Sequence, residues 1–187
     1  MAIISSLANN LLIAMPSLND PNFEKTVIYV CEHHEQGSVG LIINRPMQFP
    51  ISIVFEQLNI EPVHLAKSHM PLMFGGPVQP ERGFVIHKQF GDWRSSLFLQ
   101  EGVTVTTSND IIRAIAQDTG PKDVLVTLGY AGWVEHQLEK EILENTWLVC
   151  PYQSEILYEV PFEERWEYAG LTLGIKMNQL SSHIGHA

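Results

Sequence analysis

Val124-Leu-Val-Thr-Leu128 leads directly into Gly129-Tyr-Ala-Gly-Trp133, and this stretch decides how the chain folds. Its first half is apolar and rich in β-branched residues, which is typical of a buried central strand. The glycines that follow permit a positive φ and the close approach of another backbone. The sequence therefore predicts a central strand that ends in a sharp bend at Gly129.

Two further cassettes have the same character. Asn44-Arg45-Pro46 follows the apolar run 39–43, and Gly75-Gly76-Pro77-Val78 follows the apolar run 72–74. Proline fixes φ and removes a backbone donor, so each cassette is selected for backbone shape. We expect the three bends to lie together at one end of the sheet, where they could build one shared pocket.

Hydrophobic patterns along the rest of the chain predict many short strands and a few helices. The clearest helix covers residues 108–117, because Ser108 is a good N-cap and Gly120-Pro121 ends the pattern. Many strands with few helices indicate an α+β fold, a sheet core with helices packed outside it. Other helices are expected at 5–10, at 52–58 with Ser52 as N-cap, at 133–145 and within 161–177.

Length and charge limit the classes of protein. The 187 residues suit one domain, expected at 1–177, followed by a flexible C-terminal tail at 178–187. With 11 basic and 21 acidic residues the net charge is −10, which opposes non-specific binding to nucleic acid or anionic lipid. The basic residues are scattered and form no patch in the sequence. We therefore expect no direct nucleic-acid contact and no membrane contact.

The start of the chain is apolar but does not resemble a signal peptide. The first cation is Lys25, and Asn9-Asn10 interrupt the apolar run. No uncharged apolar stretch reaches the ~18–20 residues that cross a bilayer. Two cysteines, Cys31 and Cys150, give no disulfide framework. The sequence predicts a cytoplasmic protein.

Cys31, His33 and His34 are the first candidates for chemistry. Cys31 and His33 would share one face of a strand, where a thiolate and an imidazole could act as nucleophile and base or begin a metal site. Cys31 also continues the face of Val27 and Tyr29, which has the character of core. We favour a buried structural cysteine, because no later segment offers paired metal ligands.

Arginine at the bends could bind an anion. The guanidinium groups of Arg45 and Arg82 suit carboxylate or phosphate, and the N–H groups of Gly75-Gly76 could assist. The simpler alternative, which we favour, is that both arginines tie loops together. The glycine pair is not a P-loop, because no Gly-Lys-Ser/Thr follows it.

Acidic side chains between residues 133 and 145 could bind a divalent ion or act as acid and base. A solvated helix face with Lys140 and Glu144 one turn apart explains them more simply. The sequence contains no Gly-x-Ser-x-Gly, His-Glu-x-x-His or dinucleotide-binding fingerprint. We expect no metal and no cofactor.

Several motifs in order make the chain resemble the bacterial YqgE/AlgH family along nearly its whole length. The motifs are Leu11-Leu-Ile-Ala-Met-Pro16, Asp20-Pro-Asn-Phe23, Gly40-Leu-Ile-Ile-Asn-Arg-Pro46, Phe74-Gly-Gly-Pro-Val78, Arg82-Gly-Phe-Val-Ile-His87, Gly129-Tyr-Ala-Gly-Trp133, Gln137-Leu-Glu139 and Asn145-Thr-Trp147. The resemblance implies a bifurcated sheet folded into a pseudo-barrel and flanked by helices. It implies no established activity. The name of one branch suggests a part in regulating alginate production.

Three functions remain open. The leading hypothesis is a non-catalytic regulatory or binding domain, which could regulate transcription indirectly through a protein or a small anionic metabolite. The rival is a hydrolase or transferase in which His87 and the arginines share an open cleft, and the third is direct DNA binding. The oligomeric state stays open. The expected ligand or partner surface comprises Asn44, Arg45, Gly75, Gly76, Arg82, His87, Tyr130 and Trp133.

Overall fold

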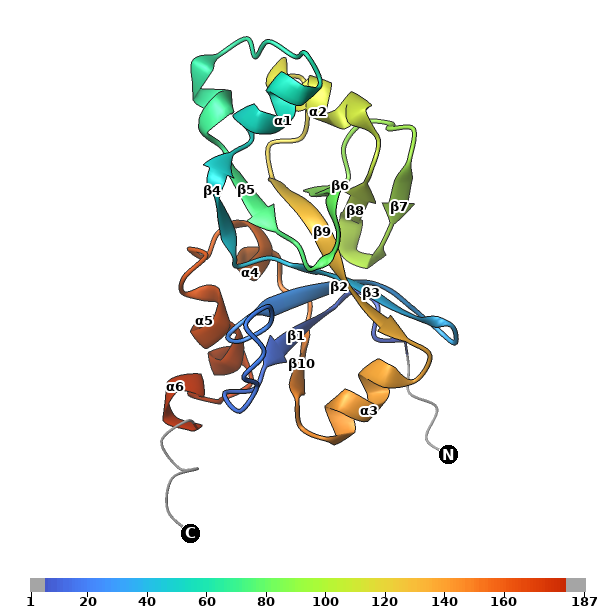
Figure 1. The fold of residues 1–187 in the computed structure, drawn as a ribbon, viewed down its shortest axis with the longest axis vertical. Helices are drawn as coiled ribbons and strands as arrows, with labels where there is room; N and C mark the ends of the chain where they lie inside the picture. The colour runs from blue at the N-terminus through green and yellow to red at the C-terminus, as the bar shows by residue number, and fades with distance from the viewer. Residues whose placement is uncertain (1–5, 181–187) are drawn as a thin grey trace.

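The computed structural model describes residues 6–180, whose strands form one strongly curled sheet (Figure 1). The strands follow the order β10-β1-β2-β3-β9-β6-β8-β7, and β4 and β5 form a branch beside β9. The sheet wraps into a half-barrel flanked by helices, which confirms the expected α+β fold with a bifurcated sheet. The strands are β1 (Asn10–Ala14), β2 (Val27–His34), β3 (Gly37–Ile42), β4 (Pro46–Pro50), β5 (Pro71–Phe74), β6 (Val78–Lys88), β7 (Ser96–Phe98), β8 (Val103–Thr106), β9 (Val124–Val134) and β10 (Trp147–Pro151).

The sheet forks within β9, at Gly129. Residues 126–128 pair with parallel β5 on one side and antiparallel β6 on the other, whereas residues 131–134 pair with β3. Gly129 has a φ of 72°, so the predicted bend is present. The expected strand end at this point is wrong, because the backbone beyond the bend finds hydrogen-bonding partners on β3 and the strand continues to Val134.

Helices at the upper end cover one face of the sheet (Figure 1). Phe55 of α1 and Ile111 and Ile115 of α2 pack on Val85 and Val126 of the sheet. The strong amphipathic pattern of α2 explains why this helix could be predicted closely. The helical segments of this end are α1 (Ser52–Gln57), the 3-10 turn η1 (Leu65–His69) and α2 (Asn109–Ala116). The 3-10 turn η2 (Gln100–Gly102) connects β7 to β8 and lies near Asn9 and Tyr152.

The remaining helices surround the lower half of the sheet (Figure 1). Leu138 of α3 packs in one core with Trp133 and Trp147. Trp166 of α5 is buried in the core of the half-barrel, and its indole N–H donates to the carbonyl of Ala14 at 2.8 Å. These helices are α3 (Gln137–Leu143), α4 (Ser154–Tyr158), α5 (Arg165–Thr172) and α6 (Met177–Leu180).

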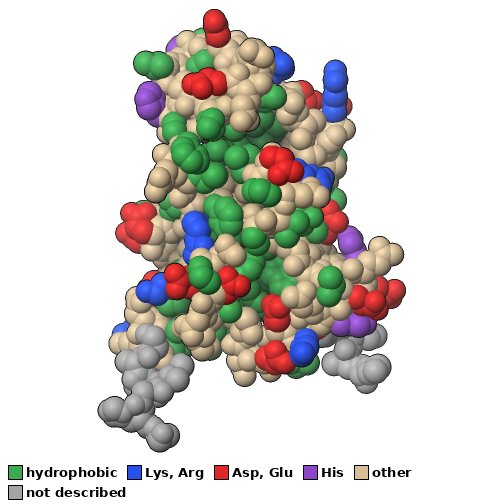
Figure 2. Space-filling view, in the orientation of Figure 1, with side chains coloured by type: hydrophobic (Ala, Val, Ile, Leu, Met, Phe, Trp, Pro, Cys, Tyr) green, Lys and Arg blue, Asp and Glu red, His purple; other side chains and the backbone are tan. Residues whose placement is uncertain are grey.

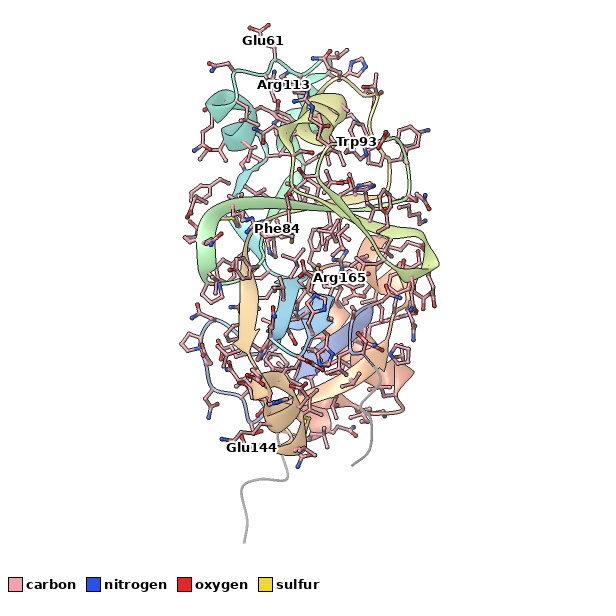
Figure 3. All side chains as sticks on the ribbon, turned by 90° about the vertical axis from the view of Figure 1, so that its right-hand side faces the viewer. Glu61, Phe84, Trp93, Arg113, Glu144 and Arg165 are labelled. Atoms are coloured by element: carbon pink, nitrogen blue, oxygen red, sulfur yellow. The ribbon has the colours of Figure 1, made fainter. Side chains whose placement is uncertain are left out.

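Arg165 fastens α5 to the end of β3, and Figure 3 shows it near the middle of the molecule. Its guanidinium is buried, stacks on Phe162 with 4.6 Å from Cζ to the ring centre, and donates to the carbonyls of Val160 and Ile43. Burial lowers the pKa of Arg165 to about 10, so the group stays charged at neutral pH. It thus holds the chain in place immediately before the first cassette.

Several helix boundaries differ from the sequence-based predictions. The helix expected from Trp133 begins only at Gln137, because β9 runs on and His136 takes a left-handed conformation with φ of 61°. The helix expected within 161–177 is split into α5 and α6 by a turn at Gly174. Ser52 is not an N-cap; Ile51 occupies that position.

Other short elements were not predicted or differ from the prediction. β4 and α4 lacked a clear periodic pattern and were not expected. Residues 8–9 form a turn in place of the expected helical lead-in. Part of the expected C-terminal tail belongs to α6, and the remainder lies outside the described residues, as does residue 5. None of the described helices is long and apolar enough to span a membrane.

Candidate functional site

The three cassettes meet at the fork of the sheet. The amide of Phe74 donates to the carbonyl of Arg45 at 2.9 Å, and the amide of Ile42 donates to the carbonyl of Gly75 at 2.8 Å. Gly75 in turn donates to the carbonyl of Leu128 at 2.7 Å. Each bond therefore joins a cassette residue to the residue immediately before another cassette or, for Ile42, two residues before it.

Glycine is required at this junction because backbone packs on backbone. Gly76 has a φ of 152°, and a Cβ on it would overlap the carbonyl group of Tyr130. A Cβ on Gly129 would overlap the carbonyl oxygen of Gly76, and one on Gly75 would overlap that of Gly129. Any larger residue would force these strands apart.

The polar side chains of the first cassette tie down a neighbouring loop. Asn44 accepts a hydrogen bond from the amide of Val27 at 2.8 Å and donates to the carbonyl of Lys25 at 2.9 Å. The guanidinium of Arg45 donates to three backbone carbonyls at 2.8–2.9 Å, those of Pro21, Asn22 and Glu24. This matches the simpler alternative for Arg45, a structural tie.

Trp133 also makes structural contacts. The side chain is buried, and its indole N–H donates to Oε2 of Glu141 at 2.8 Å. The same oxygen accepts the indole N–H of Trp147 at 2.8 Å, while Oε1 accepts a hydrogen bond from the side-chain amide of Gln137. The sequence analysis interpreted the acidic side chains of this segment as a solvated face or, less simply, as an ion or acid–base site. Glu141 is instead the acceptor for the indole N–H groups of two buried tryptophans.

His87 and Arg82 do not share a cleft with Arg45. His87 is 1% exposed; Nδ1 lies 2.8 Å from the carbonyl of Lys88 and Nε2 lies 2.9 Å from Oγ1 of Thr106. Arg82 is exposed, with its guanidinium 5.2 Å from the ring centre of Phe84. The open His/Arg cleft that the enzyme hypothesis requires is therefore not formed.

The side chains of the candidate residues thus open onto different surfaces. Asn44 and Arg45 border a hollow beside Trp166, whereas Tyr130 and Trp133 border another beside Val78. The structure brings six of the eight residues together through the backbone of the cassettes, whereas Arg82 and His87 lie farther along β6. It does not aim the side chains at one point.

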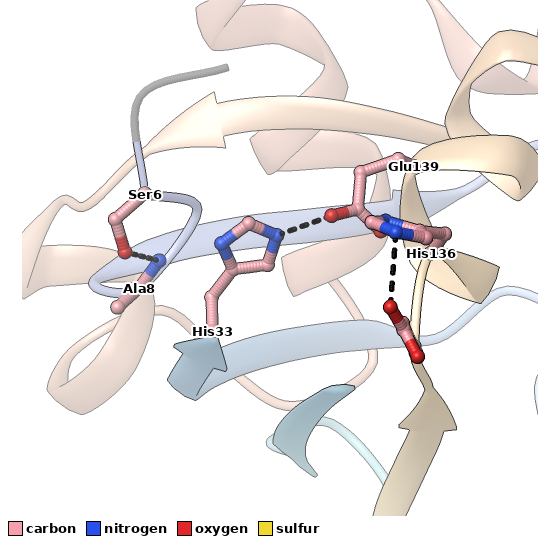
Figure 4. A network of polar contacts seen from close by, with 6 residues as sticks. Ser6, Ala8, His33, His136 and Glu139 are labelled. Carbon is pink, nitrogen blue, oxygen red and sulfur yellow. Dashed lines mark hydrogen bonds and ion pairs between the residues drawn. The ribbon is translucent and has the colours of Figure 1, made fainter. Parts of the chain in front are cut away.

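Cys31 and His33 form no joint site. Cys31 is buried, and burial raises the pKa of its thiol well above the ordinary value, which disfavours the reactive thiolate. His33 instead lies 3.1 Å from Oε1 of Glu139 on α3, as Figure 4 shows. Among residues 6–180 no group of three potential metal ligands comes together.

A bulge in β6 creates a different feature beside the cassettes. Val78 pairs with Tyr130 and Gly83 pairs with Leu128, so residues 79–82 on β6 lie opposite Gly129 alone on β9. The extra residues protrude from the sheet. A Cβ on Gly129 would lie only 3.3 Å from Cα of Pro80, so the bulge rests on the same glycine that bends β9.

A groove of about 450 Å³ lies between this bulge, α1 and α2. Figure 2 shows hydrophobic side chains gathered below the upper helices on the visible face. This volume falls in the range of small-molecule sites, which combine an apolar lining with a few polar groups. The apolar lining residues are Val54, Leu58, Pro80, Phe84, Val85, Ile112, Val126 and Leu128, and the polar ones include Gln57, Glu81, Thr106, Thr107, Ser108 and Asn109.

The start of α2 forms the polar rim of the groove. Asp110 accepts hydrogen bonds from the hydroxyl of Ser108 and from the amides of Arg94 and Ile111. Burial alone would raise the pKa of Asp110, but these hydrogen bonds together lower it, so the carboxylate is charged at neutral pH. The sequence did not reveal the groove, although it predicted the helix at 52–58, whose Val54 and Leu58 line the groove.

Comparison with known proteins defines the class. The family model described as AlgH-like matches residues 11–178, and the chain belongs to this family. This confirms the family resemblance of the cassette motifs. A UPF0301 protein of Legionella pneumophila strain Corby is 82% identical to it over 187 residues, covering all of both chains.

Solved structures share the fold. The solution structure of the AlgH protein from Pseudomonas aeruginosa has a TM-score of 0.80 and 43% identity, covering 100% of this chain and 99% of that one. The crystal structure of protein DIP2367 from Corynebacterium diphtheriae has a TM-score of 0.73, covering 95% of this chain and 92% of the other. At 16% identity the second likeness concerns the fold alone.

Proposed function

We propose that this protein is a non-catalytic binding domain of the bacterial cytosol, which receives a small amphiphilic molecule in the groove between α1, α2 and the β6 bulge. The observation that carries the proposal is the groove itself, with apolar walls and a polar rim at the start of α2. Such a domain would act on transcription indirectly, through its ligand or a protein partner.

The groove lining favours an apolar ligand body, and Arg82, which lies beside the groove but is not a lining residue, favours one anionic group at its edge. The walls offer aliphatic and aromatic side chains but no nucleophile paired with a base. Arg82 lies on the bulge between Glu81 and Gly83, which both line the groove. Among residues 6–180 its guanidinium makes one side-chain hydrogen bond, to Gln79, which is long at 3.4 Å, so the group can pair with an anion.

Leu58→Trp is expected to weaken binding of the uncharged fluorophore N-phenyl-1-naphthylamine about tenfold or more, a loss of ~1.4 kcal/mol. The larger ring would occupy the space between α1 and β6 where Leu58 lines the groove. Fluorescence titration measures the affinity. The matched control is Leu65→Trp, because Leu65 is 76% exposed on η1 and lies outside the groove lining.

The sulfonated analogue 8-anilinonaphthalene-1-sulfonate tests the charge preference. Arg82→Gln should weaken its binding while leaving that of the uncharged fluorophore unchanged, since only the sulfonate needs a cation. If Leu58→Trp and Leu65→Trp bind the uncharged fluorophore equally well, the groove is not the binding site and the proposal is wrong.

A further inference from the structure

A chain of side-chain hydrogen bonds crosses the sheet below α2. Nε2 of His87 on β6 lies 2.9 Å from Oγ1 of Thr106 on β8, which lies 2.8 Å from Oγ of Ser96 on β7. Oγ of Ser96 also lies 3.3 Å from the carbonyl oxygen of Trp93, a second acceptor within reach of its one hydrogen. The hydrogen-bonded chain therefore links a buried imidazole to the loop that precedes β7, residues 89–95, which we call the Trp93 loop.

The neutral imidazole fixes the direction of every proton in this chain. The carbonyl of Lys88 can only accept, so Nδ1 of His87 carries the hydrogen and Nε2 is an acceptor. Thr106 then donates its hydroxyl hydrogen to Nε2, and Ser96 donates to Thr106. Each group has a partner in this state.

Protonation of His87 reverses the direction. Nε2 becomes a donor, so Oγ1 of Thr106 must accept and its own hydrogen must turn towards Ser96. Ser96 can then donate only to the carbonyl of Trp93, at a separation well above the usual 2.7–2.8 Å for such bonds. The charged state therefore draws the Trp93 backbone and Ser96 closer together.

The Trp93 loop is attached to the rim of the groove, and Figure 3 shows Trp93 at the upper end of the molecule. The amide of Arg94 donates to Asp110 at 3.0 Å, and that of Ser95 donates to Oγ of Ser108 at 3.2 Å. Ser108 lines the groove, as does Thr106 within the hydrogen-bonded chain. A shift of this loop is therefore transmitted to the groove both through Ser108 at the start of α2 and through Thr106.

We propose that His87 is a proton-linked regulator of the groove, acting through Thr106, Ser96 and the Trp93 loop. This inference rests on the proposed binding function. The ligand binds more tightly when His87 is neutral, because that state leaves the loop and the start of α2 as they stand here. By linkage, bound ligand lowers the proton affinity of His87 by the same factor.

Among the described residues, the charged groups near His87 are paired, held by hydrogen bonds or exposed. Lys88, next to His87, is paired with Asp123 on the adjoining end of β9 at 2.8 Å. Asp110 on α2 is held by its own hydrogen bonds, Arg113 of the same helix is exposed, and β7 and β8 face His87 with Ser96, Thr104 and Thr106. The imidazole thus responds mainly to its burial.

The pH range follows from the direction of the shift. Burial lowers the pKa of His87 below 6.5, and the hydrogen bond to Lys88 offsets part of this effect. The unfolded chain therefore binds the proton first as the pH falls. The contribution of neutral His87 to the free energy of unfolding is complete above about pH 6.5. It is lost as the pH falls towards the folded-state pKa. The groove responds around the folded-state pKa, at the lower end of this range, because the folded imidazole takes up its proton there.

The test combines fluorescence titration with NMR between pH 8 and pH 5. Affinity for N-phenyl-1-naphthylamine should fall about fivefold or more at low pH, the lower end of common coupling between sites. His87→Asn should abolish this dependence, whereas the control His34→Asn, at an exposed histidine, should keep it. Ser96→Ala should move the midpoint to lower pH, because the hydrogen of Thr106 then lacks its acceptor.

Two outcomes separate the proposals. In the free protein, the amide resonances of Ser96 and Ser108 should titrate with the His87 ring; if they stay constant, the switch is wrong whatever the groove binds. If they titrate together but the fluorophore binding ignores both pH and Leu58→Trp, the binding proposal fails. Should His87→Asn not fold, the shift in Ser96→Ala decides the matter, and an unchanged midpoint overturns the proposal.

Discussion

Gly76→Ala is expected to destabilise the protein by about 4 kcal/mol or more, as the most damaging single substitutions do. The new Cβ would overlap the carbonyl group of Tyr130, which belongs to the backbone of the central strand and cannot rotate away. Its φ of 152° is also unfavourable for any side chain. Urea unfolding followed by circular dichroism measures the loss.

Gly174→Ala is the matched control for this prediction. Gly174 also has a positive φ, at 75°, but nothing lies within 4 Å of a Cβ placed there. It should cost only the strain of the left-handed conformation, roughly 1–2 kcal/mol. Similar losses at both positions would show that conformational strain, and not the packing of the cassettes on each other, explains Gly76.

Glu141→Met is expected to destabilise the protein by about 3 kcal/mol. The carboxylate accepts the indole N–H groups of Trp133 and Trp147, and both tryptophans are buried. Methionine keeps the volume but leaves both donors unpaired, each at a cost of ~1–3 kcal/mol. Urea unfolding measures the loss, and the near-ultraviolet circular dichroism of the tryptophans should change with it.

Two further substitutions calibrate this result. Glu141→Gln retains an accepting oxygen and should cost less than methionine at the same position. Glu144→Met changes the same residue type one position beyond α3, where the exposed carboxylate lies 3.8 Å from Lys140 and should contribute ~0.5 kcal/mol at most. A Glu141→Met variant as stable as Glu144→Met would contradict the role assigned to this carboxylate.

The fold could be predicted where local patterns and tertiary structure agree. Helix α2 was expected at 108–117 and is found at Asn109–Ala116, because its apolar stripe, capping position and terminating glycine agree. Gly129 was expected to bend the chain and does so. The continuation of β9 to Val134 depends on pairing with β3, which is distant in sequence, so the glycines alone wrongly suggested an end.

The site could be predicted only in part. Backbone-shaping residues predicted that three bends come together, and at Gly75, Gly76 and Gly129 another backbone does approach too closely for a Cβ. Side-chain direction was not accessible, because Arg45 and Trp133 find partners in loops and helices whose placement the cassettes do not encode. The groove depends on the register shift opposite Gly129, which no local pattern shows.

Intermolecular NOEs test the central claim most directly. The claim is that the cassettes and the β6 bulge shape a groove that binds an amphiphilic ligand. With N-phenyl-1-naphthylamine bound to the methyl-labelled protein, the aromatic protons of the fluorophore should show NOEs to the methyl groups of Val54, Leu58 and Ile112. NOEs confined to exposed methyl groups such as those of Val63 and Leu65 would contradict it.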